Sequence, residues 1–166
     1  MRTVVLAHGL EGRPDGTKAT ALRKAGLSVV CPDHRGLVLA PRVASLVAAV
    51  RAHPGCVLVG SSYGGLAAMA ALGEVHPLVA ELVLLAPALH WSEPPVDDPS
   101  LLLVPASLPA WVVHGVDDTV VPVAVSEALA ARSDHVVLDK VRDGHLLKAA
   151  LADIVAGVAA RAQPTV

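Results

Sequence analysis

Short runs of apolar residues alternate along this chain with longer segments in which apolar residues recur every three or four positions. The short runs are rich in Val, Leu and Ala and end at Gly, Pro or His, which is typical of strands buried on both faces of a sheet. The longer segments have the spacing of amphipathic helices. This pattern predicts strands at residues 3–7, 27–31, 56–59, 81–86, 110–113 and 135–138, and helices at residues 17–25, 41–53, 65–72, 123–132 and 146–161.

The alternation of strand and helix predicts an α/β protein with a parallel sheet. Because a parallel sheet needs helices on both faces, we expect a three-layer α/β/α sandwich around six strands. The segment 88–108 is rich in proline and predicts no strand. A length of 166 residues can bury a substantial core, so we expect one domain over residues 1–166. The last helix should face the core with Leu147, Leu151, Ile154, Val155 and Val158.

Composition excludes several classes of partner. Apolar residues make up 54% of the chain and the mean hydropathy is +0.58, yet no apolar run approaches the roughly 18 residues of a membrane-spanning helix. The net charge is −2 without a basic cluster, which argues against nucleic acid. The chain enters a strand almost at once without a basic, apolar leader, so a cytoplasmic location is expected. The oligomeric state is not indicated.

The two cysteines, Cys31 and Cys56, both fall inside predicted strands. Two scattered thiols in such a chain are expected to be reduced, buried and structural. The histidines show neither an H-E-x-x-H motif nor paired Cys/His spacing. We therefore expect no metal and no other cofactor.

The sequence G-S-S-Y-G at residues 60–64 lies between a predicted strand and a predicted helix. In that context G-x-S-x-G is the nucleophile elbow, a sharp turn that projects the serine hydroxyl above the sheet. Gly60 and Gly64 lack Cβ atoms, so strand and helix can approach closely. Here the chain resembles the α/β-hydrolase family, and the resemblance implies that Ser62 is the nucleophile.

Two later motifs extend this resemblance to nearly the whole chain. Residues 114–122, H-G-V-D-D-T-V-V-P, are similar to the family's H-G-x-x-D-x-x-V-P, which implies that the catalytic acid is Asp118 rather than its neighbour Asp117. Residues 143–145, D-G-H, follow the last strand, where the family has its histidine base, and this implies His145. The chain order Ser, Asp, His is that of the family.

The resemblance also implies an oxyanion hole, a pocket and a strand order. The backbone N–H groups of Tyr63 and, from H-G-L at residues 8–10, Leu10 are the expected oxyanion donors. Leu89, Trp91 and His34 are candidates for the substrate pocket, although Trp91 alternatively packs on the sheet edge. The second strand should lie outside the first, with the elbow, fourth, fifth and sixth strands on the other side. The family's first two strands and a large lid are missing.

These features predict a serine hydrolase that cleaves small carboxylic esters through an acyl-enzyme, with a small-molecule ester as its partner. A thioesterase or amidase would use the same residues and is not separated from an esterase by the sequence. A noncatalytic binding module on the same fold is the other alternative, and the presence of all three catalytic residue types counts against it.

Overall fold

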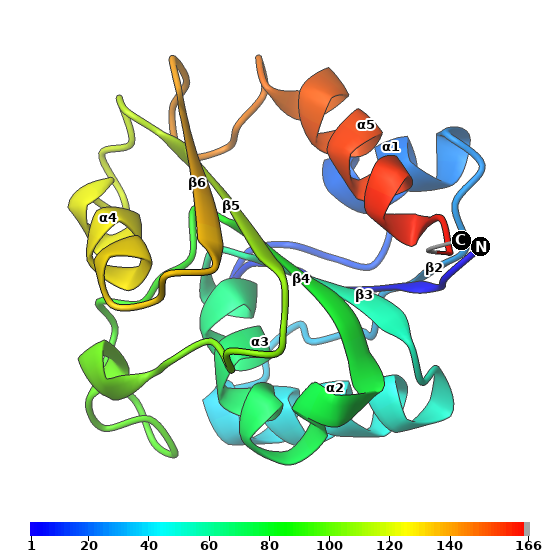
Figure 1. Cartoon of the computed structure of the whole chain (residues 1–166), viewed down its shortest axis with the longest axis horizontal. Coiled ribbons are helices and arrows are strands. Elements are labelled where there is room, and N and C mark those ends of the chain that lie inside the picture. The colour runs from blue at the N-terminus through cyan, green and yellow to red at the C-terminus, as the bar shows by residue number, and fades with distance from the viewer. Residues whose placement is uncertain (165–166) are drawn as a thin grey trace.

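The computed structural model describes residues 1–164 and contains a sheet of six parallel strands. Across the sheet the order is β2-β1-β3-β4-β5-β6, which confirms the predicted order (Figure 1). The strands are β1 (Val4–Ala7), β2 (Val29–Val30), β3 (Cys56–Ser61), β4 (Val79–Leu85), β5 (Ala110–Gly115) and β6 (Val136–Val141).

Helices cover both faces of the sheet, as Figure 1 shows. One face packs against α1 (Thr17–Lys24) and α5 (Leu151–Ala162). The other packs against α2 (Leu39–Ala52), α3 (Tyr63–Val75) and α4 (Ala124–Ala131). The predicted three-layer α/β/α sandwich is therefore confirmed. Between β4 and β5 the chain forms only a single 3₁₀ turn (Pro99–Leu101), so no lid helix is present there.

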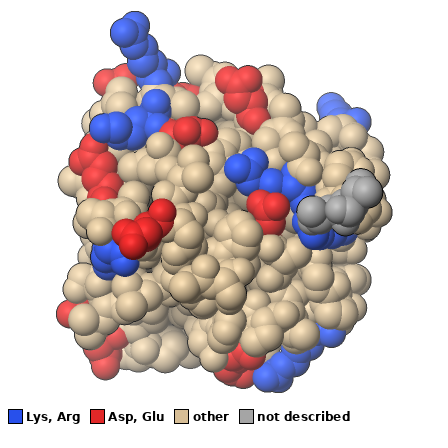
Figure 2. All heavy atoms as spheres, viewed as in Figure 1, with Lys and Arg blue, Asp and Glu red and all other residues tan. Residues whose placement is uncertain are grey.

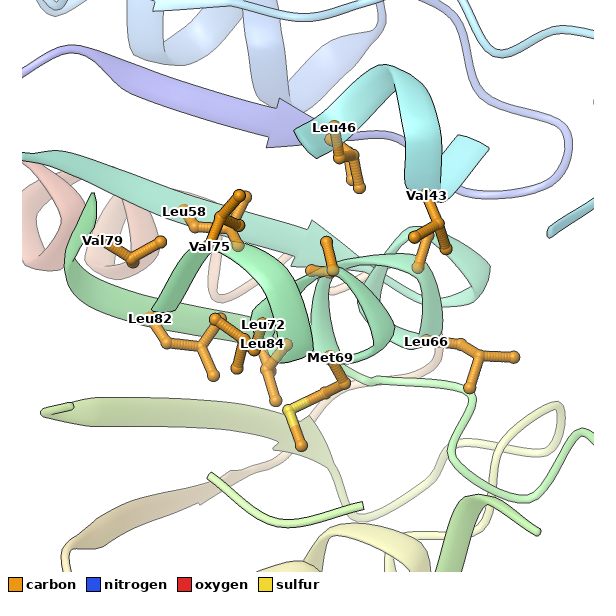
Figure 3. Packing of buried hydrophobic residues seen from close by; sticks show 14 of the residues in the cluster. Val43, Leu46, Leu58, Leu66, Met69, Leu72, Val75, Val79, Leu82 and Leu84 are labelled. Atoms are coloured by element: carbon orange, nitrogen blue, oxygen red, sulfur yellow. The ribbon is translucent and has the colours of Figure 1, made fainter. Parts of the chain in front are cut away.

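The larger part of the core lies between the sheet, α2 and α3. Figure 3 shows Leu46 of α2 and Met69 of α3 among the side chains packed with Leu58 and Leu82 of the sheet. The helix α3 is buried along most of its length, because its many Gly and Ala residues let its backbone approach the sheet. This close packing fixes the start of α3, which follows Ser62 directly.

The last helix begins later than predicted. It starts at Leu151, and Leu147 lies in the preceding loop with a positive φ of 53° and an exposure of 1%. The side chain of Asp143 accepts hydrogen bonds from the N–H groups of Gly144 (2.8 Å) and Ala150 (3.0 Å), which holds the loop in a compact non-helical form. Leu147 thus reaches the core as predicted, but from a loop.

The strand β2 is shorter than predicted, and this changes the setting of one cysteine. Cys31 lies just outside β2 and is only half-buried, so the expectation of a buried thiol within a strand was wrong for Cys31 and right for Cys56. Both thiols are free, as predicted, and β1 lies between the two strands that carry or adjoin them.

Surface charge is dispersed on the face that Figure 2 shows, where basic and acidic side chains are interspersed among uncharged residues. None of the helices formed by residues 1–164 combines the length and the apolar character needed to cross a bilayer. The two ends of the described chain meet, since the Arg2 N–H donates to the Ala162 carbonyl at 2.6 Å.

Candidate active site

Ser62 occupies a strained turn between β3 and α3. Its φ of 55° and ψ of −118° are a conformation that residues with a side chain rarely adopt. A Cβ on Gly64 would lie 2.6 Å from the carbonyl carbon of Ala7, and one on Gly60 would lie 2.7 Å from the Cα of Gly65. The predicted sharp turn is present, and glycine is required on both sides of the serine.

The structure brings the three predicted catalytic residues together. The Ser62 Oγ lies 2.9 Å from the Nε2 of His145, and the His145 Nδ1 lies 2.7 Å from the Oδ2 of Asp118. The Asp118 side chain is fully buried and that of His145 is 17% exposed, whereas Asp117 is an exposed residue. Of the two candidate acids, therefore, only Asp118 contacts the histidine.

The environment of Asp118 favours its ionised form. Burial opposes ionisation, but the hydrogen bond with His145 and those from the N–H groups of Val121 and Val120, both 2.8 Å, outweigh it and lower the pKa of Asp118. A carboxylate only accepts hydrogen bonds, so the His145 proton is on Nδ1. The unprotonated Nε2 is then free to accept the hydrogen of the Ser62 hydroxyl.

His114 contacts the Asp118 carboxylate on the side buried in the core. Its side chain is fully buried, and its Nε2 lies 2.8 Å from the Val121 carbonyl and 3.2 Å from the Asp118 Oδ2. Because the carbonyl only accepts, Nε2 carries the proton, and Nδ1 accepts from the Ser126 hydroxyl at 2.7 Å. His114 is thus a buried histidine with both ring nitrogens hydrogen-bonded, and it fixes the turn that carries the acid.

Backbone contacts join the loop of the acid to the loop of the base. The N–H groups of Val116 and Asp117 donate to the carbonyls of Val141 (2.8 Å) and Asp143 (3.1 Å). Gly115 lies so close to the Asp143 backbone that there is no room for a Cβ. The distance between Asp118 and His145 is therefore set by the ends of β5 and β6.

Asp143 and Lys18 hold the loop of His145 from its other side. The hydrogen bond from the Ala150 N–H lowers the pKa of Asp143. Desolvation opposes this shift, but further backbone N–H groups add to it, so the pKa stays below its ordinary value. The Lys18 Nζ donates to the Leu146 carbonyl at 3.1 Å. Burial lowers the pKa of Lys18, and the charge of Asp143 opposes that shift.

The two expected oxyanion donors border Ser62. Tyr63 is the first residue of α3, so its N–H is among those that a helix leaves without an intrahelical acceptor. A Cβ on Gly9 would lie 3.6 Å from the Ser62 Cβ, which brings the Gly9–Leu10 peptide beside the serine. Within residues 1–164, the Leu10 N–H donates to no backbone carbonyl.

The three candidate pocket residues do not form a pocket. His34 is fully buried: its Nε2 lies 3.1 Å from the Ser45 Oγ, and its backbone N–H donates to the His8 ring. Leu89 packs in the core at 5% exposure. Neither offers surface to a substrate, so their prediction as cleft residues was wrong. Trp91 is 54% exposed, which also excludes the alternative that it packs closely on the sheet edge.

The sequence reasoning missed Arg42, a fully buried cation in the first turns of α2. A signal for it exists, because Arg42 stands four and eight residues before Leu46 and Val50 and thus on the apolar face of that helix.

Across the described residues, no three His, Cys, Asp or Glu side chains are grouped as the ligands of a metal ion would be.

Comparisons with known proteins identify a family and several structures that resemble this chain. Residues 8–97, which include Leu10 and Ser62, match the model of the Uncharacterised protein family UPF0227. A protein from Xanthomonas campestris pv. campestris, described as a hydrolase of the alpha/beta superfamily, has a TM-score of 0.79 at 28% identity, over 96% of this chain and 97% of that one. No curated protein matches the chain in sequence.

Two further solved structures share the fold at lower identity. A protein from Butyrivibrio proteoclasticus with ferulic acid bound has a TM-score of 0.81 at 17% identity, over 95% of this chain and 86% of that one. A metagenome-derived lipolytic enzyme has a TM-score of 0.72 at 19% identity, over 95% of this chain and 93% of the enzyme.

Proposed function

Since this chain belongs to the family UPF0227 and is a hydrolase of the alpha/beta superfamily, we propose that it is a serine hydrolase that cleaves small carboxylic esters through an acyl-enzyme. One observation carries the proposal: the continuous series of hydrogen-bond contacts from Asp118 through His145 to Ser62. A noncatalytic module would have no use for a serine hydroxyl aligned on a histidine that a buried carboxylate orients.

In the first half of the proposed reaction, the His145 Nε2 takes the proton of the Ser62 hydroxyl while Oγ attacks the ester carbonyl carbon. The N–H groups of Leu10 and Tyr63 receive the oxygen of the tetrahedral anion, and one such donor contributes about 10²–10³-fold to the rate. The anionic Asp118 stabilises the imidazolium. His145 then gives its proton to the alcohol oxygen, the bond between carbonyl carbon and alcohol oxygen breaks, and the acyl group stays on Ser62.

In the second half, His145 takes a proton from water, and the hydroxide oxygen attacks the acyl carbon. The second tetrahedral anion forms at the same N–H groups. It collapses with release of the carboxylic acid, and the proton on His145 returns to the Ser62 oxygen. Each step of the cycle thus uses water, the three side chains and the two backbone N–H groups already described.

The surroundings of Ser62 favour small esters with an apolar group. Exposed apolar side chains stand on four of the loops at the same edge of the sheet: Leu10, Trp91, Val120 and Leu146. The absence of a lid helix between β4 and β5 leaves this edge open. An open rim of this kind suits a short acyl chain or an aromatic ring better than a long lipid, and the ferulic acid held by the Butyrivibrio protein is of the same size class.

The test is a panel of p-nitrophenyl esters of increasing acyl length, together with a fluorophosphonate probe and peptide mapping. We expect hydrolysis that declines with chain length and labelling at Ser62 alone. The Ser62→Ala variant should lose both, while the neighbouring Ser61→Ala control should keep both. Labelling at Ser61, or full activity in Ser62→Ala, would contradict the proposal, and faster turnover of thioesters or amides would replace the ester class.

A further inference from the structure

Arg42 is a buried cation that contacts no counter-ion within residues 1–164. Its Nε donates to the Leu37 carbonyl at 2.9 Å, and its Nη1 donates to the carbonyls of His8 (3.0 Å) and Gly9 (3.4 Å). Its buried Nη2 has no hydrogen-bond partner in the described chain. Burial lowers the pKa of Arg42, while Tyr63 and the charge of Glu93 oppose the shift, and a guanidinium stays protonated at ordinary pH. Burying a charge that contacts no carboxylate is costly even when carbonyls accept its hydrogen bonds, so stability alone does not account for this residue.

Arg42 acts on the peptide unit that carries one oxyanion donor. The Gly9 carbonyl and the Leu10 N–H belong to one planar trans peptide, so they point in opposite directions. The carbonyl is held by the Arg42 Nη1 and by the His8 Nδ1, which lies 2.8 Å away. The His8 Nε2 accepts the His34 N–H at 3.0 Å, so the His8 proton is on Nδ1 and is donated. Fixing the carbonyl on one side directs the Leu10 N–H on the other.

Arg42 also contacts the residue that supplies the second donor. Its guanidinium carbon lies 4.7 Å from the centre of the Tyr63 ring, within the range of a cation–π interaction. The Tyr63 hydroxyl donates to the Glu93 carboxylate, which also accepts the Leu39 N–H at 2.9 Å. The Tyr63 ring is thereby held between the guanidinium and a carboxylate that is itself anchored to the start of α2.

We propose that Arg42 is a positioning residue for the oxyanion hole, whose buried charge fixes the Leu10 and Tyr63 N–H groups and stabilises the tetrahedral anion through the Gly9–Leu10 peptide. This inference rests on the proposed ester hydrolysis. The positive charge polarises that peptide, which makes its N–H a stronger donor in a site of low dielectric constant. A neutral ester gains little from this, whereas the tetrahedral intermediate carries a full negative charge. Arg42 therefore acts on turnover and not on substrate binding.

Three variants test the inference: Arg42→Met, of similar length without charge, Arg42→Lys, with charge but without the planar fork, and the control Arg51→Met. Arg51 lies on the same helix, but it is exposed and paired with Glu74. For each variant we would measure kcat and KM with p-nitrophenyl butyrate, the Ki of a trifluoromethyl ketone that forms an oxyanion on Ser62, and folding by circular dichroism.

We expect Arg42→Met to lower kcat by about 10²-fold with KM within threefold, and to weaken the ketone by the same factor as kcat. Arg42→Lys should fall between this variant and the wild type, and Arg51→Met should match the wild type. A folded Arg42→Met with kcat and ketone affinity within threefold of wild type would overturn the inference, as would a loss confined to KM.

If Arg42→Met does not fold, Arg42→Lys decides by the same two readouts, and failure of both to fold would assign Arg42 to stability and also overturn the inference. The proposed function is tested separately by fluorophosphonate labelling of the wild-type protein. If Ser62 is labelled while the Arg42 variants keep kcat, only the role of Arg42 is refuted. If the wild type shows neither labelling nor esterase activity, the proposed function itself has failed.

Discussion

Replacing Gly115 with alanine should separate the acid from the base without changing either. Gly115 ends β5, three residues before Asp118. Its Cα faces the backbone of Asp143 and Gly144. A methyl group there would lie 2.8 Å from the Asp143 carbonyl carbon and 2.8 Å from the Gly144 carbonyl oxygen, and nearer still to the Asp143 carbonyl oxygen. Both neighbours are backbone atoms, so no side-chain rotation can relieve the contact.

The size of the effect follows from the required movement. Ordinary contacts of such atoms begin at 3.4 Å, so relief of the 2.8 Å contacts alone needs a separation of about 0.6 Å, and the nearer Asp143 carbonyl oxygen requires a larger one. The hydrogen bond between Asp118 and His145 is 2.7 Å long and would be stretched or misaligned by this shift. Because a misplacement of about 1 Å can cost about 10²-fold in rate, we expect Gly115→Ala to lower kcat by about 10–100-fold. Overpacking should also cost about 1–3 kcal/mol of unfolding free energy.

The assay compares kcat for p-nitrophenyl butyrate and urea unfolding among Gly115→Ala and two glycine controls. Gly144→Ala stands beside His145, but its Cβ would meet nothing within 4 Å, so its activity should be near that of wild type. Gly73→Ala lies in α3, also in open space, and should raise the unfolding free energy by about 0.5–1 kcal/mol, since alanine favours helix.

The reasoning would be refuted by a Gly115→Ala enzyme that keeps kcat within twofold of wild type while remaining folded. It would equally be refuted if Gly144→Ala lost as much activity as Gly115→Ala, because the loss would then follow from any change near His145 and not from the contact between the two loops.

Two further predictions concern the site and its support. Asp118→Asn should stay folded and lower kcat by about 10³–10⁴-fold, less than Ser62→Ala does, since the carboxylate only orients and stabilises the base; saturating ester kinetics measure the difference. Burial, together with the charges of Arg42 and His8 and against that of Asp33, lowers the pKa of His34 to about 4 from 6.5. The unfolded chain therefore binds the extra proton between these values, and stability should fall by up to about 3 kcal/mol as pH drops from 6.5 to 4. Urea unfolding at pH 7 and pH 4.5 measures this fall in the free energy of unfolding, and the fall should be smaller in His34→Asn than in the wild type.

The elements of the fold were predictable because their signals are local. A buried parallel strand is a short apolar run, and the turn at Ser62 is marked by glycines on both sides. The candidate catalytic residues followed from the resemblance to the α/β-hydrolase family, which is carried by motifs at strand ends, where the topology brings loops of distant sequence to one edge. The strands and helices needed only the residues within one segment.

The failed predictions depend on side-chain contacts that the apolar pattern of the sequence does not contain. His34 follows a strand in a polar loop, which resembles a cleft position, but His8 and Ser45 enclose it from loop and helix. Leu147 has helical spacing with the residues after it, yet Asp143 captures the N–H groups that would begin the helix there. Glu93, in the segment without strands, is tied to Tyr63 across thirty positions of the chain. No local pattern announces such contacts.

The register of the sheet determines which residues of the loops meet in the candidate site. Gly60 at the end of β3 pairs with Ala7 at the end of β1, and Gly115 at the end of β5 pairs with Val141 at the end of β6. A slip of one residue between β5 and β6 would move the loop of His145 by about 3.3 Å along the strand and turn its side chains to the other face. The 2.7 Å bond to Asp118 would then be lost, although both loops kept their own structure. Since β6 is an edge strand, β5 is its one partner in the described sheet, and the contacts of Gly115 with Asp143 fix that pairing at the point where the chemistry requires it.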